Sequence, residues 1–447
     1  MMMRRSIAKL QRNFSRIYSN IDKLLQFYSD TQNYSIYQLE NFQNKRLNEL
    51  INHCYKNVPY YKKFLDKKKL EDFDTKSLQT IPILSKEIIR KNFEDLKSLD
   101  LYKRRWFINS SGGSTGEPVK VIQDNDYLIH SEARKLLSFS WAGLNVGEHL
   151  IRLWGSERDI LGKGVRYEKF KDFIQNRKTL NSFILTPNMM EEYIQIINKS
   201  HSYSILAYAN AAYEISKYGN KNQLSINKPK TIISTSGNLH SFIRDEIEKF
   251  FNCNVFDQYG SREVSCIASE CSFHEGLHVS EETMIVEIVD DNGSPCEIEQ
   301  EGDILVTSLM NYSMPLIRYK IGDRGIFARG LCKCGKPYKR LKSISGRKMD
   351  NFKLIDGTII PSEYFIHFIG VVLNKGSIKK VQLIQKKYDL VHLKLVYSGM
   401  NISEKEMNDL IKSVRDVMGK DCEVKLFVQE DILPSPSGKF RYTICEI

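Results

Sequence analysis

A run of hydroxyl-bearing residues and glycines at Ser110–Lys120 is the feature that most constrains the fold. Its flanks, Trp106–Ile108 and Val119–Ile122, have the apolar character of strands, so the run is predicted to turn a hairpin. Glycines let backbone N–H groups approach an anion closely and adopt positive φ, and Ser and Thr hydroxyls add further donors. The run is therefore predicted to be a loop that holds phosphate groups.

The residue order within this loop disfavours one common class of phosphate site. A Walker-type loop has the pattern G-x-x-x-x-G-K-[ST] and leads directly into a helix, whereas Glu117 and Pro118 follow Gly116 here. A kinase-type or GTPase-type loop is thus disfavoured. The other interpretation is a mobile Ser/Gly surface loop, and motifs elsewhere in the chain must decide between the two.

Length and composition bound the class of protein. A chain of 447 residues is too long for one core and indicates about two to four lobes. With 41% hydrophobic and 27% charged residues, the composition is that of an ordinary soluble protein. No stretch approaches the ~20 apolar residues of a membrane helix, and Met1–Arg5 leads into no signal-peptide core. A cytoplasmic location is expected.

The net charge of +12 allows several acidic partners. The lysines are scattered along the chain and no nucleic-acid motif accompanies them, so nucleic acid is not an expected partner, whereas ATP-sized anions are. The basic, amphipathic stretch Arg4–Leu25 leaves two alternatives open. It makes weak contact with an acidic membrane surface, or it packs as a helix on the protein body.

The pattern along the chain predicts an α/β fold. Residues 1–100 are expected to form a helical N-terminal segment, and residues 101–345 the main core, in which helices and strands alternate around a mostly parallel sheet before the chain becomes strand-rich. Residues 346–447 are expected to form a small mobile α+β lobe, with a helix that opens at Ser403 in a capping box with Glu406. Ligands of such sheets lie at the carboxyl ends of strands.

Four further segments stand in a fixed order after the loop: Asp257–Glu263, Met314–Asp323, Gly346–Asp350 and Ser435–Phe440. Together with the loop they resemble the adenylate-forming superfamily, and more closely its phenylacetate–CoA ligase-like branch. The forms YGSRE and MPLIRYKIGD are most similar to branch members encoded with capsule and surface-polysaccharide genes. The resemblance extends over essentially the whole chain.

The resemblance implies ATP-dependent conversion of a carboxylic acid into an acyl-adenylate, with pyrophosphate release. It implies that Glu263 binds Mg²⁺, that Asp323 binds the ribose hydroxyls, and that Arg347 reaches the ribose or the phosphate. Lys439 would bridge the acid and ATP when the small lobe closes. The remaining nucleotide-binding candidates line the phosphate, adenine and acyl subsites: Ser111, Gly112, Gly113, Ser114, Thr115, Gly116, Lys120, Gly237, Tyr259 and Gly260.

The chain departs from the superfamily at the hinge before the small lobe. The usual acid or lysine is replaced by Met349, and Asp350 follows it, so the hinge residue stays open. Rotation to a thiol-accepting conformation is therefore less firmly implied than adenylation. CoA, a carrier thiol and an amine all remain as acceptors, and a non-catalytic nucleotide-binding scaffold of a polysaccharide assembly is the alternative function.

Nine cysteines without a signal peptide argue against a disulfide framework. A separate group of soft ligands is suited to tetrahedral Zn²⁺: Cys271, His278, Cys332 and Cys334. Cys266 or His274 are alternatives to His278 as the fourth ligand. The sequence leaves a closed structural zinc site and ordinary free thiols as two open interpretations.

Overall fold

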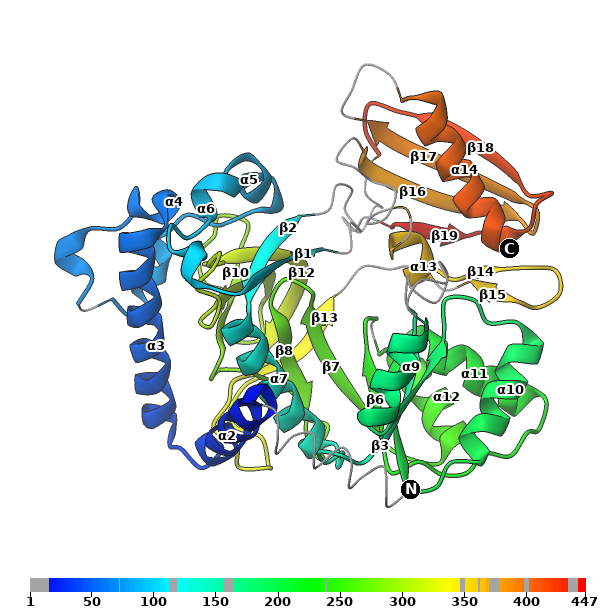
Figure 1. Ribbon diagram of the computed structural model, residues 1–447, viewed down its shortest axis with the longest axis horizontal. Helices are drawn as coiled ribbons and strands as arrows, with labels where there is room; N and C mark the ends of the chain where they lie inside the picture. The colour runs from blue at the N-terminus through cyan, green and yellow to red at the C-terminus, as the bar shows by residue number, and fades with distance from the viewer. Residues whose placement is uncertain are drawn as a thin grey trace. The chain divides into compact units, whose positions relative to one another are not determined.

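The computed structural model describes residues 16–71, 73–111, 119–155, 165–237, 239–345, 350–360, 362–367, 369, 378–397, 402–432 and 441–447. The chain forms two compact units (Figure 1). Unit 1 consists of Met1–Asn109, Val119–Gly147 and Phe256–Gly346, and unit 2 consists of Ser110–Pro118, Glu148–Val255 and Arg347–Ile447.

Unit 1 begins with helices, as the sequence predicts. The helices of this segment are α2 (Arg16–Thr31), α3 (Ile36–Asn57), α4 (Pro59–Lys62), α5 (Lys86–Lys91) and α6 (Phe93–Leu96). Helix α3 starts at Ser35, whose hydroxyl accepts a hydrogen bond from the Gln38 N–H in a reciprocal capping box. It ends just before Pro59, because proline lacks the backbone N–H that a longer α3 would need. The same proline opens α4, since it fits the first turn of a helix.

The candidate phosphate loop connects β1 (Trp106–Ser110) to β2 (Lys120–Asp124), which pair as a two-stranded sheet, so the predicted hairpin is confirmed. Helix α7 (Asn125–Trp141) follows at once and is capped by Asp124, which accepts the Tyr127 N–H. Helix α2 packs on α7 through a small apolar cluster that includes Tyr28, Ala133 and Leu137. Residues 1–15 lie outside the described residues, so a membrane contact of the N-terminus stays a prediction.

The rest of unit 1 is rich in strands, as predicted, and the structure shows that they pair antiparallel. Its strands run in the order β10-β11-β12-β13-β9-β8-β7. Their bounds are β7 (Val255–Ser261), β8 (Ser265–Glu270), β9 (Leu277–Val279), β10 (Met284–Val289), β11 (Glu301–Ser308), β12 (Tyr319–Phe327) and β13 (Arg340–Ser345). Leu84 forms a parallel bridge with Tyr319, which fixes the N-terminal helical segment to the start of β12.

Unit 2 contains the predicted parallel layer. Its strands are β3 (His149–Trp154), β4 (Arg177–Asn181), β5 (Tyr203–Tyr208) and β6 (Ile232–Thr235), and all the pairs in the order β6-β5-β3-β4 are parallel. The helices are α9 (Val165–Ile174), α10 (Pro187–Asn198), α11 (Ala209–Lys221) and α12 (Ser241–Phe251). The apolar faces of α10, α11 and α12 form one core with these strands.

The C-terminal part of unit 2 is an α+β arrangement. A hairpin of β14 (Phe352–Lys353) and β15 (Ile359–Ile360) is followed by α13 (Ser362–His367) and a sheet in the order β18-β17-β16-β19. The remaining bounds are β16 (Ile378–Lys387), β17 (Leu390–Tyr397), α14 (Glu404–Met418), β18 (Glu423–Val428) and β19 (Thr443–Cys445). The capping box of Ser403 and Glu406 is confirmed.

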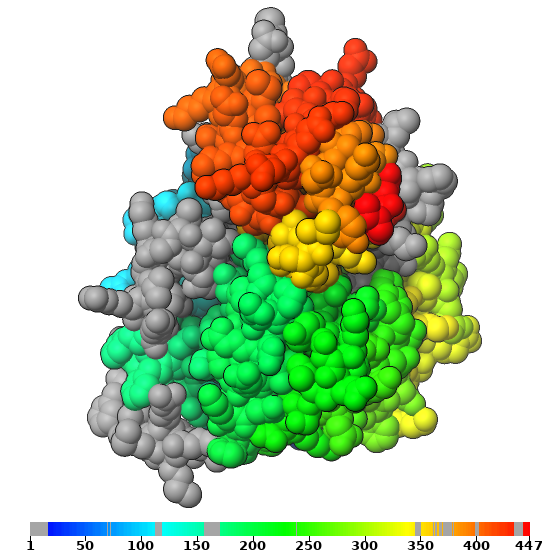
Figure 2. Space-filling view, turned by 90° about the vertical axis from the view of Figure 1, so that its right-hand side faces the viewer, coloured from blue at the N-terminus to red at the C-terminus, as the bar shows by residue number. Residues whose placement is uncertain are grey.

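The hairpin β14–β15 connects this C-terminal part to the parallel layer of unit 2. Leu185 and Ile359 exchange both backbone hydrogen bonds, at 3.0 and 2.9 Å. Figure 2 shows the hairpin, in yellow, against the green surface of the segment that carries α10 to α12. Within the described residues, no helix is both long enough and apolar enough to span a bilayer.

Candidate functional site

The turn between β7 and β8 carries Glu263, the predicted Mg²⁺ ligand, and is held from two sides. The side-chain amide of Gln123, on β2, donates to the carbonyls of Arg262 and Glu263, at 3.0 Å each. The Tyr127 hydroxyl, in the first turn of α7, reaches the Glu263 carbonyl at 3.4 Å. Strand β2, which follows the candidate phosphate loop, and helix α7 after it therefore fix the position of this acidic turn.

The Glu263 side chain is buried, with 4% of its surface exposed. Its Oε1 accepts a hydrogen bond of 3.1 Å from the hydroxyl of Tyr319, at the start of β12. Across the described parts of the chain, no lysine or arginine forms an ion pair with this carboxylate. A buried carboxylate is costly without a cation. A hard divalent ion such as Mg²⁺, which prefers oxygen ligands, fits this position.

A second pair of side chains joins β7 itself to β12. The Tyr259 hydroxyl, on β7, donates to Oδ2 of Asp323, on β12, at 2.9 Å. Strands β7 and β12 are not neighbours in the sheet, so these contacts require the sheet to curve until the two strands face each other. The curvature brings two of the predicted nucleotide-binding residues together.

A bulge in β12 presents Asp323. The register of β11 with β12 shifts between Asp303, opposite Arg324, and Leu305, opposite Lys320. The extra residues include Gly322, whose φ of +100° is accessible to glycine at little cost. Bulges frequently redirect a side chain next to an active site. The half-exposed Asp323 carboxylate accepts from Tyr259 and, as an acceptor-only group, suits further hydroxyl donors.

Gly260 has a packing reason to be glycine. It lies at the irregular pairing of β7 with β8, and a Cβ atom there would meet the carbonyl oxygen of Ser265 at 2.4 Å. The backbone of the hairpin therefore approaches itself too closely for any side chain at this position. This tight pairing keeps Tyr259 and Glu263 at the two ends of one short, rigid segment.

The structure describes three more of the predicted nucleotide-binding residues: Lys120, Ser111 and Gly237. Lys120 is exposed at the start of β2 in unit 1. In unit 2, Ser111 is buried directly after β1, and Gly237 follows β6, at the carboxyl end of a parallel strand. The remaining predicted site residues lie outside the described residues: Gly112, Gly113, Ser114, Thr115, Gly116, Arg347 and Lys439.

Of the two hinge candidates, Met349 and Asp350, the structure describes Asp350. Met349 lies outside the described residues. The Asp350 carboxylate accepts hydrogen bonds from the Arg441 guanidinium and, at 3.0 Å, from the N–H of Cys445. Its backbone N–H donates to Thr443 Oγ1 at 3.1 Å. Asp350 is thus joined to the C-terminal strand β19 within unit 2.

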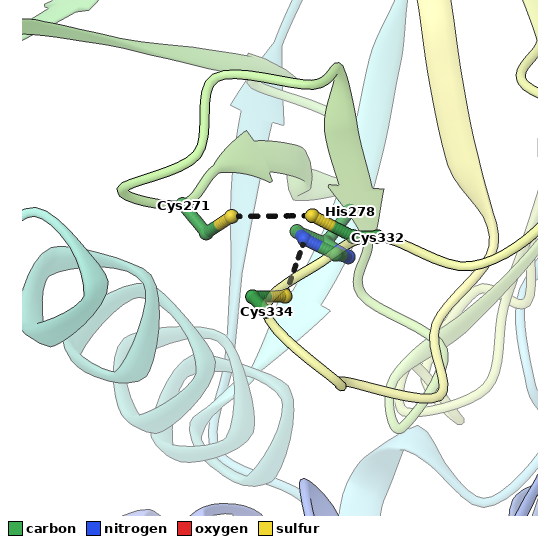
Figure 3. A group of neighbouring side chains, drawn as sticks. All are labelled: Cys271, His278, Cys332 and Cys334. Atoms are coloured by element: carbon green, nitrogen blue, oxygen red, sulfur yellow. Dashed lines mark hydrogen bonds between the residues drawn. The ribbon is translucent and has the colours of Figure 1, made fainter.

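The predicted soft-ligand group comes together in unit 1 (Figure 3). One ligand atom from each of its four residues lies within 4.8 Å of the others: Cys271, His278, Cys332 and Cys334. Cys271 follows β8, His278 is in β9, and the other two lie in the segment between β12 and β13. Burial and the nearby charge of Lys336 lower the pKa of His278 to about 3, which keeps the imidazole neutral.

Sequence reasoning did not identify Gln123 and Tyr319 as residues of the site, although they hold Glu263. Tyr319 was inside a recognised segment, but its role depends on a contact with a residue 56 positions away. Gln123 gave a partial signal, because this polar side chain directly follows the apolar pair Val121 and Ile122 in β2. Such a residue is expected to find a polar partner in the interior.

Comparisons with known proteins give matches to CapK and to phenylacetate–coenzyme A ligases. Residues 354–446 match the family model of the CapK C-terminal domain. The chain is 26% identical over 419 residues to Protein CapK of Staphylococcus aureus, a match that covers 91% of this chain and 89% of that protein. It is 23% identical over 370 residues to the phenylacetate–coenzyme A ligase of Thermus thermophilus, which covers 77% of this chain and 81% of the relative.

The fold is also that of solved ligase structures. A structure of 2-hydroxyisobutyryl-CoA ligase in complex with 2-HIB-AMP and CoA, in the thioesterification state, superposes with a TM-score of 0.61 at 16% identity. The match covers 91% of this chain and 90% of that one. An open conformation of the same ligase gives a TM-score of 0.57 at 17% identity, with 91% of each chain covered.

Proposed function

We propose that this chain, a member of the adenylate-forming superfamily in the branch of CapK and the phenylacetate–CoA ligases, activates a carboxylic acid with ATP and transfers the acyl group to CoA. The family resemblance and the α/β fold class predicted from the sequence are confirmed by the relatives and by the solved ligase structures. Relatives named as CoA ligases, and structures that hold an acyl-AMP and CoA, support an adenylate-forming CoA ligase.

The observation that carries the proposal is the environment of Glu263. Its carboxylate is buried and hydrogen-bonded to Tyr319, and no basic side chain of the described residues neutralises it. A site that must hold Mg²⁺ with a polyphosphate needs such a carboxylate, because Mg²⁺ is usually bound through one or two carboxylates together with substrate phosphates. When bound, the ion neutralises charge on the phosphates.

The proposed reaction has two steps. A carboxylate oxygen of the acid attacks the α-phosphorus of ATP, the bond from that phosphorus to the bridging oxygen breaks, and pyrophosphate leaves. The CoA sulfur then attacks the acyl carbon, loses its proton, and AMP departs. In this scheme Asp323, held by Tyr259, accepts hydrogen bonds from the ribose and so orients the α-phosphate for in-line attack.

The remaining roles are proposed from the family resemblance. The loop residues Ser111–Gly116 would donate to the β- and γ-phosphates, and Arg347 would reach the ribose or phosphate. Lys439 would bring its positive charge to the attacking carboxylate and the α-phosphate, where negative charge concentrates in the transition state. A carrier thiol or an amine would accept the acyl group by the same attack. A role in capsule or surface-polysaccharide synthesis rests on the similarity to CapK.

The proposal is tested by acid-dependent pyrophosphate release with Mg-ATP, over aryl, fatty, hydroxy and amino acids, each with and without CoA. We expect one class of acid to give release, and Lys439→Ala to abolish it. Lys420→Ala is the matched control, because Lys420 is an exposed lysine of the same C-terminal region. Bound ATP without release for any acid would instead favour the non-catalytic scaffold.

Asp323→Ala is expected to raise the KM for ATP by about 10- to 100-fold and to change kcat less. Hydrogen bonds to a charged group contribute about 1.5–3 kcal/mol. The bonds from the ribose to Asp323 are present in the ATP complex and in the transition state alike, so their loss weakens ATP binding more than it slows the reaction. Initial rates over a range of ATP concentrations measure the effect. Asp291→Ala, which removes an exposed carboxylate of unit 1, should leave the KM unchanged; an unchanged KM in Asp323→Ala would contradict the ribose role.

A further inference from the structure

We propose that unit 1 binds one structural zinc ion in a closed tetrahedral site formed by four side chains: Cys271, His278, Cys332 and Cys334. The site lies apart from the proposed reaction and fixes the segment between β12 and β13 to the loop after β8 and to β9. It does not depend on the proposed ligase activity.

The distances between the four ligand atoms fit a shared zinc ion better than a disulfide between two of the cysteines. Zn–S and Zn–N bonds of about 2.3 and 2.0 Å in a tetrahedron place neighbouring ligand atoms roughly 3.3–3.8 Å apart. The Sγ atoms of Cys271 and Cys332 are 3.7 Å apart, and Cys334 Sγ is 3.4 Å from His278 Nε2. A disulfide would need sulfur atoms about 2.0 Å apart. Figure 3 shows the three sulfurs and the imidazole directed toward one another.

Two tight turns direct backbone N–H groups to two of the three sulfurs. At the first, the His274 N–H donates to the Cys271 carbonyl at 3.1 Å, and the Phe273 N–H is directed to Sγ of Cys271. At the second, the Gly335 N–H donates to the Cys332 carbonyl at 3.0 Å, and the Cys334 N–H is directed to Sγ of Cys332. Gly335 has a φ of +77°, which closes this turn at little cost.

These backbone donors have a consequence for metal binding. An N–H group directed at a cysteine sulfur stabilises the thiolate, which is the form that binds a metal. Burial acts in the opposite direction and raises the pKa of both thiols, so the turns support the site through geometry, by holding the sulfurs of Cys271 and Cys332 next to each other.

The other two candidates for the fourth ligand are engaged elsewhere. The Cys266 sulfur contacts the hydroxyls of Ser269, at 3.3 Å, and Ser138, at 3.6 Å. His274 Nδ1 lies 3.1 Å from the carboxylate of Glu270. His278 is fully buried, and its Nε2 faces Cys334. The structure thus selects His278 from the alternatives that the sequence leaves open.

The surrounding charges suit an occupied site. Three thiolates and one neutral imidazole around Zn²⁺ carry a net charge of −1. The positive charges of Lys336, Arg134 and Arg340 all act on His278. Arg134 is paired with Glu282 and Arg340 lies near Glu275, so these cations are already partly balanced, and a centre of net negative charge beside them is a compatible neighbour.

The position of the site indicates a structural role. The Trp141 ring, at the end of α7, packs edge-on against the His278 ring at a centroid distance of 5.6 Å. The first turn of α7 contacts the Glu263 turn, and its 17 residues separate the two ends by roughly 25 Å at 1.5 Å per residue. Four protein ligands also leave no open position for a substrate or an activated water.

The first test is the metal content of the purified full chain, for which we expect about one zinc per chain. Replacement of the metal by Co²⁺ should give the intense thiolate-to-cobalt absorption of a tetrahedral site, and one equivalent of Zn²⁺ should remove it. A folded chain that contains no zinc after growth with added zinc, and that shows no such absorption with Co²⁺, would overturn the proposal.

The second test uses Cys334→Ser, which removes the most accessible ligand, with Cys296→Ser as a control at a half-exposed cysteine outside the group. We expect zinc affinity to fall at least roughly tenfold and the Tm to fall in the first variant, with neither change in the second. Unaltered zinc affinity in folded Cys334→Ser would contradict the ligand assignment. If that variant does not fold, the cobalt absorption of the native chain, and the loss of that absorption when zinc is added, decide whether the site exists.

Discussion

Glu263→Gln is expected to lower acid-dependent pyrophosphate release by about 10²- to 10³-fold, the range typical for loss of one electrostatic contact to a transition state. The amide has nearly the same shape as the carboxylate and can still accept the hydrogen bond from Tyr319, so folding should be preserved. What it lacks is the negative charge that compensates a divalent cation in this buried turn. The measurement is pyrophosphate release as Mg²⁺ is varied at saturating ATP.

Two further variants separate the charge of Glu263 from its packing. Tyr319→Phe removes only the hydrogen bond and should reduce the rate much less than Glu263→Gln does. Glu297→Gln changes an exposed glutamate of unit 1 and should have no effect. A folded Glu263→Gln enzyme with a rate within twofold of the native rate would exclude the role proposed for this carboxylate.

Arg134→Met is expected to destabilise the protein by about 3–5 kcal/mol, the cost of leaving one member of a buried ion pair without its partner. Arg134 Nε lies 3.0 Å from Glu282 Oε2, and the two side chains are 1% and 0% exposed. Glu282 also accepts hydrogen bonds from the hydroxyls of Thr31, at 3.0 Å, and Tyr338. The pair therefore connects α2, α7 and the strand-rich part of unit 1. Urea unfolding followed by tryptophan fluorescence measures the loss.

The double variant Arg134→Met/Glu282→Leu is the control for this interpretation. Because an apolar pair of similar volume often replaces a buried ion pair without loss, the double variant should regain much of the stability that Arg134→Met loses. Equal destabilisation in the single and double variants would show that packing around Arg134, and not the unpaired charge, sets the cost. A loss below about 1 kcal/mol in the single variant would contradict the account.

Local signals allowed much of the fold to be predicted. Strands β1 and β2 pair as the apolar flanks of the Ser110–Lys120 run predict, and Ser403 with Glu406 forms the predicted capping box. Both depend on residues close in sequence. The strand order of unit 1 was not predictable in this way, because the curvature that brings β7 to face β12 depends on pairings between distant segments.

The candidate site shows the same limit. Ordered motifs identified Glu263 and Asp323, but the residues that hold them are recognised only through contacts between distant parts of the chain, such as that of Gln123 with the Glu263 carbonyl. In the soft-ligand group, the sequence predicts His278 as the fourth ligand and leaves His274 and Cys266 as alternatives. In three dimensions the His274 ring lies against another group, with Nδ1 3.1 Å from the Glu270 carboxylate. The roles of Arg347 and Lys439 stay predictions from the family resemblance.

The central claim, acyl-adenylate formation, is tested most directly by following a carboxylate oxygen. The acid class that gives the fastest pyrophosphate release is supplied with ¹⁸O in both carboxylate oxygens, together with Mg-ATP and CoA, and the products are analysed by mass spectrometry. The account predicts one ¹⁸O in the phosphate of AMP for each thioester formed, because the attacking oxygen stays on phosphorus when the acyl group leaves. Label in inorganic phosphate with ADP as the product, or unlabelled AMP, would contradict it.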